Sequence, residues 1–326
     1  MRCLITGASG YIGTRLVEDL QREAPSIQLL NVDIAPPGCA NQQAFYRHAD
    51  ILDLSRLRVV FQEFRPDVVI HLAAQTSFIK QAKGLDFYRA NTEGTRNVLD
   101  AIEATASVMR VLITSTCFVC QPGYDPKHDE DFSPHTIYGR SKVVSERITR
   151  QAQLKCTWTI IRPGTIWGPS KWTQHVTMLS LMRRKRYWHP GRQAVMRPLG
   201  YIGNATYQIR KLALEAPPED IHGRVFYVCD PPTNVYEWVN ECSKQLLGRS
   251  VRVAPRRLIW CVAVAGDLIK RIRGRFPLTT FRFKNMTGDY RVPVERTLEL
   301  VGPLPYSLQT AVSEWVQWFR LKCERN

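Results

Sequence analysis

The sequence predicts an α/β protein: a doubly wound parallel sheet with a smaller, partly interleaved C-terminal domain. Two observations lead to this prediction. Short β-branched or aliphatic runs alternate with longer helical patterns as far as Arg162, and such alternation is typical of parallel strands covered by helices on both faces. Beyond Arg162 the alternation ends in a loop-rich segment that contains Pro163, Gly164, Gly168 and Pro169. A length of 326 residues allows two domains or one large one.

The elements follow in chain order, with most of them in the first half. The predicted strands are Cys3–Thr6, Leu29–Asp33, Val68–Leu72, Val111–Ser115, Thr159–Arg162 and Gly223–Val228. The predicted helices are Tyr11–Glu23, Leu54–Phe64, Phe87–Ala104, Tyr138–Gln151 and a basic helix near Gln174–Tyr187. We expect the strand near 223–228 to return to the first domain.

Charge is distributed unevenly along the chain. Lys and Arg number 45 and Asp and Glu 29, which gives a net charge of +16. Residues 1–150 carry 17 basic and 17 acidic side chains, whereas residues 151–326 carry 28 and 12, so the whole excess lies in the second half. Residues 151–200 hold nine basic side chains and no acidic one. This asymmetry indicates that the second half faces something anionic, because a solvated surface accounts for only part of it.

The sequence contains no pattern for export or for a membrane span. Met1–Thr6 runs directly into a glycine-rich turn without a signal-peptide apolar region. The longest apolar stretch, Leu258–Ile269, includes Gly266 and Asp267 and is too short to cross a bilayer. Nine cysteines without regular spacing fit a reducing compartment better than a disulfide framework. We therefore expect a cytoplasmic protein.

A glycine-rich turn over residues 7–13 follows the first predicted strand and precedes the first helix. Glycines at this place let the backbone approach a pyrophosphate, whose charge sits at the helix N-terminus. Asp33 ends the second strand, 20 residues after Gly13, and an acid there accepts hydrogen bonds from ribose hydroxyls and repels a 2′-phosphate. This favours NAD over NADP, with a purely structural turn as the alternative. The cofactor-binding residues predicted here are Gly7, Gly10, Tyr11, Ile12, Gly13 and Asp33.

Tyr138 and Lys142 are four residues apart and lie on one face of a predicted helix. An ammonium beside a phenol stabilises the phenolate and lowers the tyrosine pKa toward the working pH. Thr116 follows the fourth strand, at the strand ends where open α/β sheets bind ligands, and its hydroxyl can hydrogen-bond a substrate oxygen. Taken singly, both features have ordinary structural explanations, since such pairs occur on many helices and Ser and Thr often end strands.

Together and in this order, these motifs resemble the extended short-chain dehydrogenase/reductase family, in particular its nucleotide-sugar epimerase/dehydratase branch. The resemblance covers about residues 1–230 and includes Ala49–Asp53, His71–Ala74, Asn91–Thr95 and Arg162–Pro169. It implies a Rossmann domain for NAD over residues 1–165 and a mainly substrate-binding domain over residues 166–326. Further cofactor contacts that it implies are Asp50, Ile51, Leu72, Ala73, Ala74, Asn91, Lys142 and Pro163.

The same resemblance assigns roles to the polar residues. Tyr138 corresponds to the catalytic base, Lys142 to its activator and nicotinamide-ribose ligand, and Thr116 to the hydroxyl partner. Arg197 matches the position where the branch binds the substrate diphosphate, and a guanidinium fork suits two phosphate oxygens. Arg282 is a second candidate for such a contact, although both arginines can also be surface residues.

His175 aligns with a histidine that epimerase-reductases of the branch use as an acid. Those enzymes place a cysteine two residues after the catalytic hydroxyl, and this chain has Phe118 there. Cys117 is one position away and points to the other face of a strand. We therefore expect His175 to be a helix-surface or substrate-pocket histidine.

Two departures from the branch bear on the reaction. The 4,6-dehydratases follow the catalytic Thr with Asp and Glu, the acid and base that eliminate water, and this chain has Cys117 and Phe118. Dehydration is therefore not expected. Cys120 and Gln121 replace a Tyr and a Gly of the family, which leaves the local geometry open. Cys117 and Cys120 form a C-x-x-C, but no second ligand pair accompanies it, so we expect no metal site.

The resemblance favours an NAD-dependent epimerase that acts on a nucleotide sugar, at C4, through a transient 4-keto sugar. A reductase or dehydrogenase of a keto sugar or a steroid-like alcohol is the alternative within the fold. A non-catalytic NAD-binding regulator is less consistent with the complete Thr/Tyr/Lys set. We expect no nucleic-acid partner, because no helix-turn-helix or RNP-type motif is present, and we expect a homodimer.

Basic and aromatic residues flank the apolar stretch of the second half. The runs are Arg183–Trp188, Arg256–Trp260 and Lys270–Phe276. A diphosphate requires only one or two arginines, and this pattern suits an anionic lipid headgroup region. The sequence leaves two interpretations open: peripheral docking on an anionic membrane, or an apolar stretch that packs in the C-terminal domain with arginines solvating its rim.

Overall fold

The chain divides into two compact units in a computed structural model that describes residues 1–77, 84–170, 175–274 and 276–323. Unit 1 comprises residues 1–164, 202–229 and 293–305, and unit 2 comprises residues 165–201, 230–292 and 306–326. The first change of unit falls beside the predicted boundary at residue 165. The chain then re-enters unit 1 twice, and the sequence predicted only the return that includes the strand near 223–228. The substrate-binding role of residues 166–326 stays a prediction.

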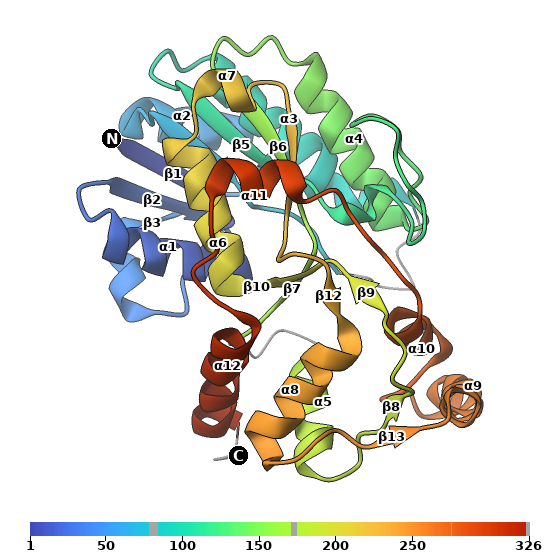
Figure 1. Cartoon of the computed structure of the whole chain (residues 1–326). Helices are drawn as coiled ribbons and strands as arrows, with labels where there is room; N and C mark the ends of the chain where they lie inside the picture. Colours follow the sequence, from blue (N-terminus) through green and yellow to red (C-terminus); the bar gives the residue numbers. More distant parts are fainter. Residues whose placement is uncertain (78–83, 171–174, 275, 324–326) are drawn as a thin grey trace. The chain divides into compact units, whose positions relative to one another are not determined.

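Unit 1 is built on a seven-stranded sheet whose neighbouring strands are all parallel, in the order β11-β6-β5-β4-β1-β2-β3 (Figure 1). This confirms the predicted doubly wound class, and six strands lie within two residues of their predicted bounds. The sequence missed β3 because it is three residues long and not buried. The strands are β1 Arg2–Thr6, β2 Gln28–Asp33, β3 Tyr46–His48, β4 Val68–His71, β5 Arg110–Thr114, β6 Thr157–Pro163 and β11 Val225–Val228.

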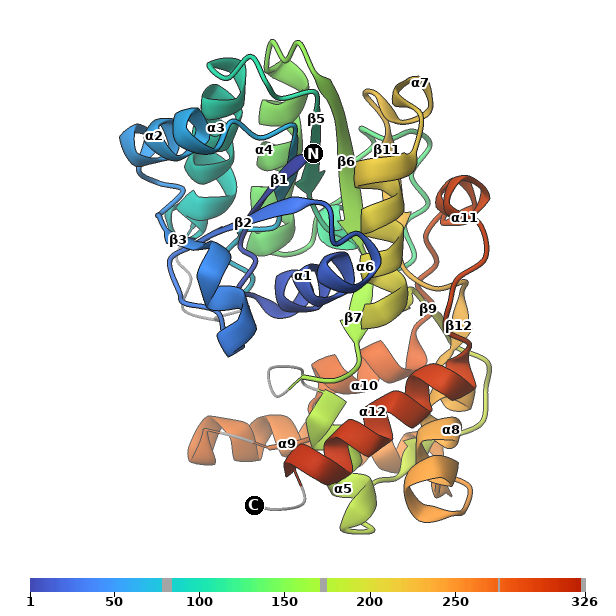
Figure 2. The ribbon, with the colours of Figure 1, turned by 90° about the vertical axis from the view of Figure 1, so that its left-hand side faces the viewer.

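Helices cover both faces of this sheet, with α2, α3 and α4 on one face and α1 and α6 on the other (Figure 2). Side chains that accept hydrogen bonds from first-turn amides begin two of them: Asp53 caps α2 and Thr136 caps α4. The helices are α1 Tyr11–Glu23, α2 Leu54–Phe64, α3 Arg89–Glu103, α4 Ile137–Gln151, α6 Ile202–Arg210, α7 Pro218–Ile221 and α11 Glu295–Val301. Shorter helical turns are Ala40–Phe45, Leu85–Tyr88, Cys117–Val119 and the π-helical Lys211–Glu215.

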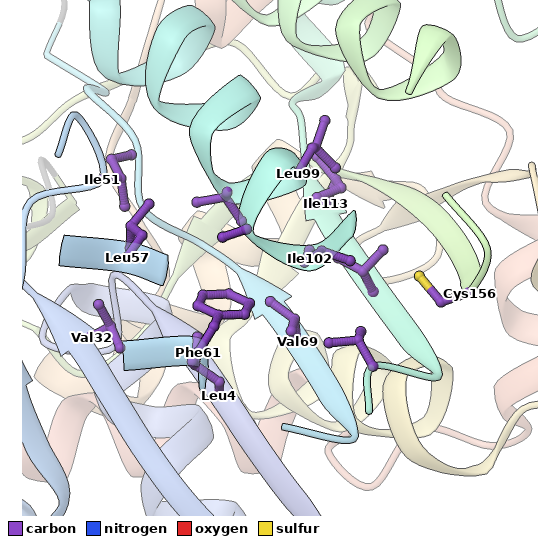
Figure 3. Packing of buried hydrophobic residues seen from close by; sticks show 14 of the residues in the cluster. Leu4, Val32, Ile51, Leu57, Phe61, Val69, Leu99, Ile102, Ile113 and Cys156 are labelled. Atoms are coloured by element: carbon purple, nitrogen blue, oxygen red, sulfur yellow. The ribbon is translucent and has the colours of Figure 1, made fainter. Parts of the chain in front are cut away.

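One large hydrophobic cluster of unit 1 fills the space between the sheet and helices α2 and α3 (Figure 3). Leu4 and Val69 come from central strands, Phe61 from α2 and Leu99 from α3, and all four are buried. Burying one such side chain contributes about 1.5–3 kcal/mol to folding. This packing holds the sheet rigidly, so the loops at the carboxyl ends of its strands have a fixed base.

Unit 2 contains short strand pairs and a group of helices. Strand β7 pairs with β10 in parallel, β8 with β13 in parallel, and β9 with β12 antiparallel. Helix α5 ends at Arg183, earlier than predicted, and Lys185 then takes a left-handed φ of 58°; Gln174 lies outside the described residues. The strands are β7 Thr165–Trp167, β8 His189–Pro190, β9 Met196–Arg197, β10 Leu199–Tyr201, β12 Thr233–Asn234 and β13 Val253–Ala254. The helices are α5 His175–Arg183, α8 Val235–Leu247, α9 Arg256–Arg273, α10 Thr280–Thr287 and α12 Leu308–Cys323.

Candidate active site

The glycine turn lies where the strand order of the sheet changes direction. Strands β2 and β3 lie on one side of β1, and β4, β5, β6 and β11 lie on the other; ligands of open α/β sheets bind at such switch points. Gly7 has a φ of 74°, and a Cβ atom there would lie 2.5 Å from the backbone nitrogen of Ala73, which follows β4. A Cβ at Gly13 would lie 2.4 Å from the Cα of Ala8. Only glycine therefore permits this close packing of the turn.

The two acids predicted for the adenosine end both follow strands of the same half of the sheet. Asp33 ends β2, and its carboxylate accepts hydrogen bonds from the backbone N–H groups of Ser9 (3.1 Å) and Ala35 (3.0 Å). The fold therefore brings Asp33 to the glycine turn. Asp50 is exposed in the loop after β3, and Ile51 beside it is buried.

Helix α4 carries Tyr138 and Lys142 against the carboxyl end of β5. The close approach depends on Gly139, where a Cβ would lie 2.3 Å from the carbonyl oxygen of Phe118. The Tyr138 phenol and the Thr116 hydroxyl are hydrogen-bonded. Lys142 donates from Nζ to the carbonyl oxygen of Thr114, at 2.7 Å. The structure thus brings all three predicted catalytic residues together, and all three are buried.

Burial, rather than the Tyr/Lys pairing, dominates the proton affinities of this group. Burial raises the pKa of Tyr138, and the hydrogen bond with Thr116 opposes that rise. Burial lowers the pKa of Lys142 to about 8, and the negative charge of Glu146 opposes that change. The sequence predicted a lowered Tyr138 pKa with Lys142 as its cause. The difference arises because both groups lose water and the ammonium donates to a carbonyl oxygen.

Sequence reasoning missed a buried ion pair beneath the site. Glu146 lies four residues after Lys142 on α4, and Arg162 lies on β6. Their charged atoms are 2.8 Å apart, with side-chain exposures of 0% and 1%. Glu146 also accepts a hydrogen bond from the Ser115 hydroxyl at 2.5 Å, and Arg162 donates to the Tyr227 hydroxyl at 2.9 Å. The helical spacing of residues 138, 142 and 146 was the available signal.

A second buried hydrogen-bond network joins β4, α3 and α4. His71 Nδ1 lies 2.7 Å from the Thr6 hydroxyl, and its Nε2 lies 3.2 Å from the Thr95 hydroxyl. Asn91 donates to the Ser141 hydroxyl at 2.9 Å, and Ser141 donates to the carbonyl oxygen of Tyr138. Burial lowers the pKa of His71 to about 3, so its imidazole is neutral at physiological pH. The predicted contact Asn91 therefore also supports the backbone of the tyrosine.

Three predicted substrate residues belong to unit 2. The His175 ring packs edge-on against Trp238, at 5.4 Å between centroids, and the residue is partly exposed. Burial lowers the pKa of His175 to about 4, and Arg282 adds to this effect. Arg197 is 6% exposed and stacks over the ring of Tyr290 at 5.3 Å. His175, Arg197 and Arg282 are thus described only by their contacts with other residues of unit 2.

The residues present fit a dinucleotide cofactor. Helix α1 begins at Tyr11, its N-cap Gly10 provides no side-chain cap and its first turn contains no acid, so its first amides can face an anion. The Tyr11 and Thr114 hydroxyls are buried and have no hydrogen-bond partner among the described residues. The predicted contacts Leu72 and Ala74 are partly exposed after β4, whereas Pro163 is buried at the end of β6.

A seven-stranded parallel sheet with a glycine turn at its switch point and a buried Thr/Tyr/Lys group defines a Rossmann-type enzyme of the extended short-chain dehydrogenase class. Residues 3–229 match the profile of the NAD-dependent epimerase/dehydratase family, and the chain belongs to this family. The protein is therefore an enzyme of an NAD-dependent family, as the sequence predicted.

The relatives include both epimerases and dehydratases. The chain is 25% identical, over 97% of its length and 94% of the relative's, to the N-acetyl-α-D-glucosaminyl-diphospho-ditrans,octacis-undecaprenol 4-epimerase of Escherichia coli O157:H7. Two solved structures share the fold: Thermotoga maritima UDP-glucose 4-epimerase (TM-score 0.72, 20% identity, 99% of this chain and 100% of that one) and Bacillus anthracis dTDP-glucose 4,6-dehydratase (TM-score 0.72, 17% identity, 99% and 98%).

Proposed function

We propose that the protein catalyses the NAD-dependent epimerisation of a nucleotide sugar at C4. The observation that carries the proposal is the buried Thr116–Tyr138 pair beside Lys142 at the carboxyl end of β5. In this proposal the glycine turn and Asp33 hold the cofactor. Bound NAD supplies a reversible hydride acceptor, so the hydride that leaves C4 can return to the opposite face and no external oxidant is consumed.

The side chains supply the proton chemistry in this proposal. The phenolate form of Tyr138 accepts the proton of the C4 hydroxyl as the carbonyl forms, and the resulting phenol returns that proton when the carbonyl is reduced. Thr116 orients that hydroxyl through its own hydrogen bond. Lys142 holds a positive charge beside the phenolate, and Glu146 maintains that charge by raising the lysine pKa. In unit 2, Arg197 is our candidate ligand of the diphosphate, with Arg282 and His175 as further substrate contacts.

Elimination of water is not part of the proposal. Cys117 is buried and Phe118 is apolar, so neither position after Thr116 supplies a carboxylate. Burial also keeps both thiols of the C-x-x-C away from water, and both are free cysteines. A 4-keto-6-deoxy product would contradict this part of the proposal.

The test is incubation of the protein with UDP-, GDP- and dTDP-sugars and no added reductant, followed by separation of the products. Interconversion of a C4 epimer pair is expected. Turnover that requires a stoichiometric nicotinamide reductant or oxidant would instead support a reductase or dehydrogenase and overturn the epimerase.

A second carrier has a specific observation in its favour. The relative matched over 97% of the chain is named for a sugar linked through diphosphate to a polyprenol. A polyprenyl diphosphate presents the same sugar and the same two phosphates as a nucleotide sugar, with a lipid in place of the nucleoside. The substrate panel therefore includes N-acetylglucosaminyl-diphospho-undecaprenol in detergent, and preference for this compound over UDP-N-acetylglucosamine would assign the lipid carrier.

The finer predictions of location and assembly are part of the proposal. We propose that the enzyme works in the cytoplasm as a homodimer. Sedimentation velocity tests the oligomeric state. Peripheral contact with an anionic membrane is also a prediction. No helix in the described part of the chain is long and apolar enough to span a bilayer.

A further inference from the structure

Helix α9 exposes an apolar face along its length. Ile259, Ala263 and Gly266 form its inner stripe and are buried. A Cβ at Gly266 would lie 2.0 Å from the carbonyl oxygen of Leu278, so the following segment crosses the helix in close contact. Ile259 and Ala263 pack with Phe283 of α10 in one small cluster. These contacts settle which face of α9 points away from unit 2.

The face opposite this stripe is covered by apolar side chains. Helical spacing places the apolar residues 258, 261, 264, 265, 268 and 272 on it. Leu258 is 56% exposed, Leu268 59% and Ile272 77%. Trp260 is half-exposed at one border, and Phe281 of the adjacent α10 is also exposed. Exposed apolar side chains in such a continuous row are unusual in a protein surrounded only by water.

Basic side chains stand at both ends of this apolar face. Arg257 near the start and Arg271 near the end are exposed, and neither has an ion-pair partner among the described residues. The single acid of the helix, Asp267, accepts hydrogen bonds from the backbone and hydroxyl of Thr280, on the α10 side. The exposed face is therefore apolar in the middle, cationic at its ends and free of acidic groups.

We propose that this face of α9, together with Phe281, is a docking surface for an anionic lipid bilayer. The row of Leu, Val and Ile side chains enters the boundary between headgroups and acyl chains, and Arg257 and Arg271 meet anionic headgroups. Charge complementarity selects a bilayer over a second apolar protein surface, because the helix ends are cationic and the second half of the chain holds the whole net charge of +16. The proposal deepens the predicted membrane contact and does not depend on the epimerase activity.

The docking surface is consistent with its surroundings in unit 2. Trp188 is 46% exposed and immediately precedes β8, which packs against α9. The guanidinium carbon of Arg252 lies over the Trp188 ring, 5.5 Å from the ring centroid. Such an aromatic–cation combination suits the interfacial region of a membrane. Arg184 and Lys185 nearby in sequence are exposed as well. Arg275 of the predicted basic run lies outside the described residues.

The test is co-sedimentation of the full chain with phosphatidylcholine vesicles, with and without phosphatidylglycerol. Binding is expected only with the anionic vesicles, and about 1 M salt is expected to weaken it strongly. The variant Leu268→Glu/Ile272→Glu should lower the partition coefficient at least about ten-fold. Replacing Arg257 and Arg271 by Gln should lower it about five-fold for each side chain at low salt.

The matched control is Val59→Glu/Met109→Glu, which makes the same charge change at two exposed apolar positions of unit 1. The fall in its partition coefficient should be less than half of the fall in the α9 variant. An environment-sensitive dye on the exposed Cys261, with Cys39 and Cys323 replaced by Ser, should shift to the blue on vesicles. The dye reports entry into the apolar layer, which attraction of charges alone does not produce.

Three results would overturn the docking surface. They are absence of binding to anionic vesicles at low salt, equal losses in the α9 and control variants, and dissociation of a dimer by Leu268→Glu/Ile272→Glu without any vesicle binding. The last would assign the face to a second copy of the chain. Turnover of soluble nucleotide sugars should be unchanged in every variant. A protein that binds vesicles but epimerises no sugar would refute the proposed function and leave the docking surface standing.

Discussion

Helices α4 and α9 use similar residues in opposite environments. Helix α4 buries its polar side chains: Tyr138, Lys142 and Glu146 are all within the protein and each has a hydrogen-bond or ion-pair partner. Helix α9 instead exposes its apolar side chains, and its exposed Arg257 and Arg271 have no ion-pair partner among the described residues. The comparison teaches that burial, more than residue type, determines what a lysine or an arginine does. A buried cation changes its pKa and positions its neighbours, whereas an exposed one is available to an anionic surface.

The largest expected effect is on the proton acceptor of α4. Tyr138→Phe removes the phenol that accepts the proton and leaves the glycine turn intact. Turnover should fall by about 10²–10⁴-fold, the usual contribution of general acid–base catalysis, while NAD affinity measured by calorimetry stays within about two-fold. Near-normal turnover would show that another group is the base.

The buried ion pair under α4 should matter far more than an exposed one. Glu146→Ala leaves the Arg162 charge buried without its partner, and the free energy of unfolding should fall by about 3–5 kcal/mol. The matched control is Glu63→Ala, which breaks the exposed pair between Arg47 and Glu63 (2.6 Å) and should cost less than about 1 kcal/mol. Urea unfolding measures the free energy of unfolding of both variants. Equal losses in the two variants would contradict the role assigned to burial.

The variant Lys142→Met tests how the buried ammonium of α4 affects the free energy of unfolding. Because burial lowers the pKa of Lys142 from 10.5 to about 8, the folded protein binds one proton fewer than the unfolded chain between these pH values. Lys142 therefore makes the free energy of unfolding rise with pH from about 8 to 10.5. The difference between wild type and Lys142→Met, measured by urea unfolding across this window, should show that rise, and the variant should bind NAD more weakly. A difference independent of pH would contradict the lowered pKa.

The smallest effect concerns the acid beside the glycine turn. Asp33→Asn keeps the hydrogen-bond acceptor for Ser9 but removes the charge that repels a 2′-phosphate. The preference for NAD over NADP should shrink by at least about five-fold, as one charge in a hydrated site is worth about 1 kcal/mol. Calorimetric titration with both dinucleotides measures it, and an unchanged ratio would remove Asp33 from cofactor selection.

Much of unit 1 follows from local sequence patterns. Helices Tyr11–Glu23 and Leu54–Phe64 have their predicted bounds, because the apolar spacing of both, and the Asp53 cap of the second, are local features of the sequence. The proximity of Thr116 to Tyr138 could be expected only through the family resemblance. The second re-entry of the chain, at residues 293–305, could not be read from the sequence, since it depends on packing between segments distant along the chain.

By itself, the sequence determined the alternating strands and helices, the glycine turn with Asp33, and the Tyr138 and Lys142 positions on one helix face, because each is a pattern within a short segment. The tertiary structure alone decided that Glu146 pairs with Arg162, that burial raises the Tyr138 pKa, and that His175 packs among tryptophans. It also decided which face of α9 is exposed. These properties depend on how much water each group loses, and that loss is set by residues far apart in the chain that only the folded protein brings into contact.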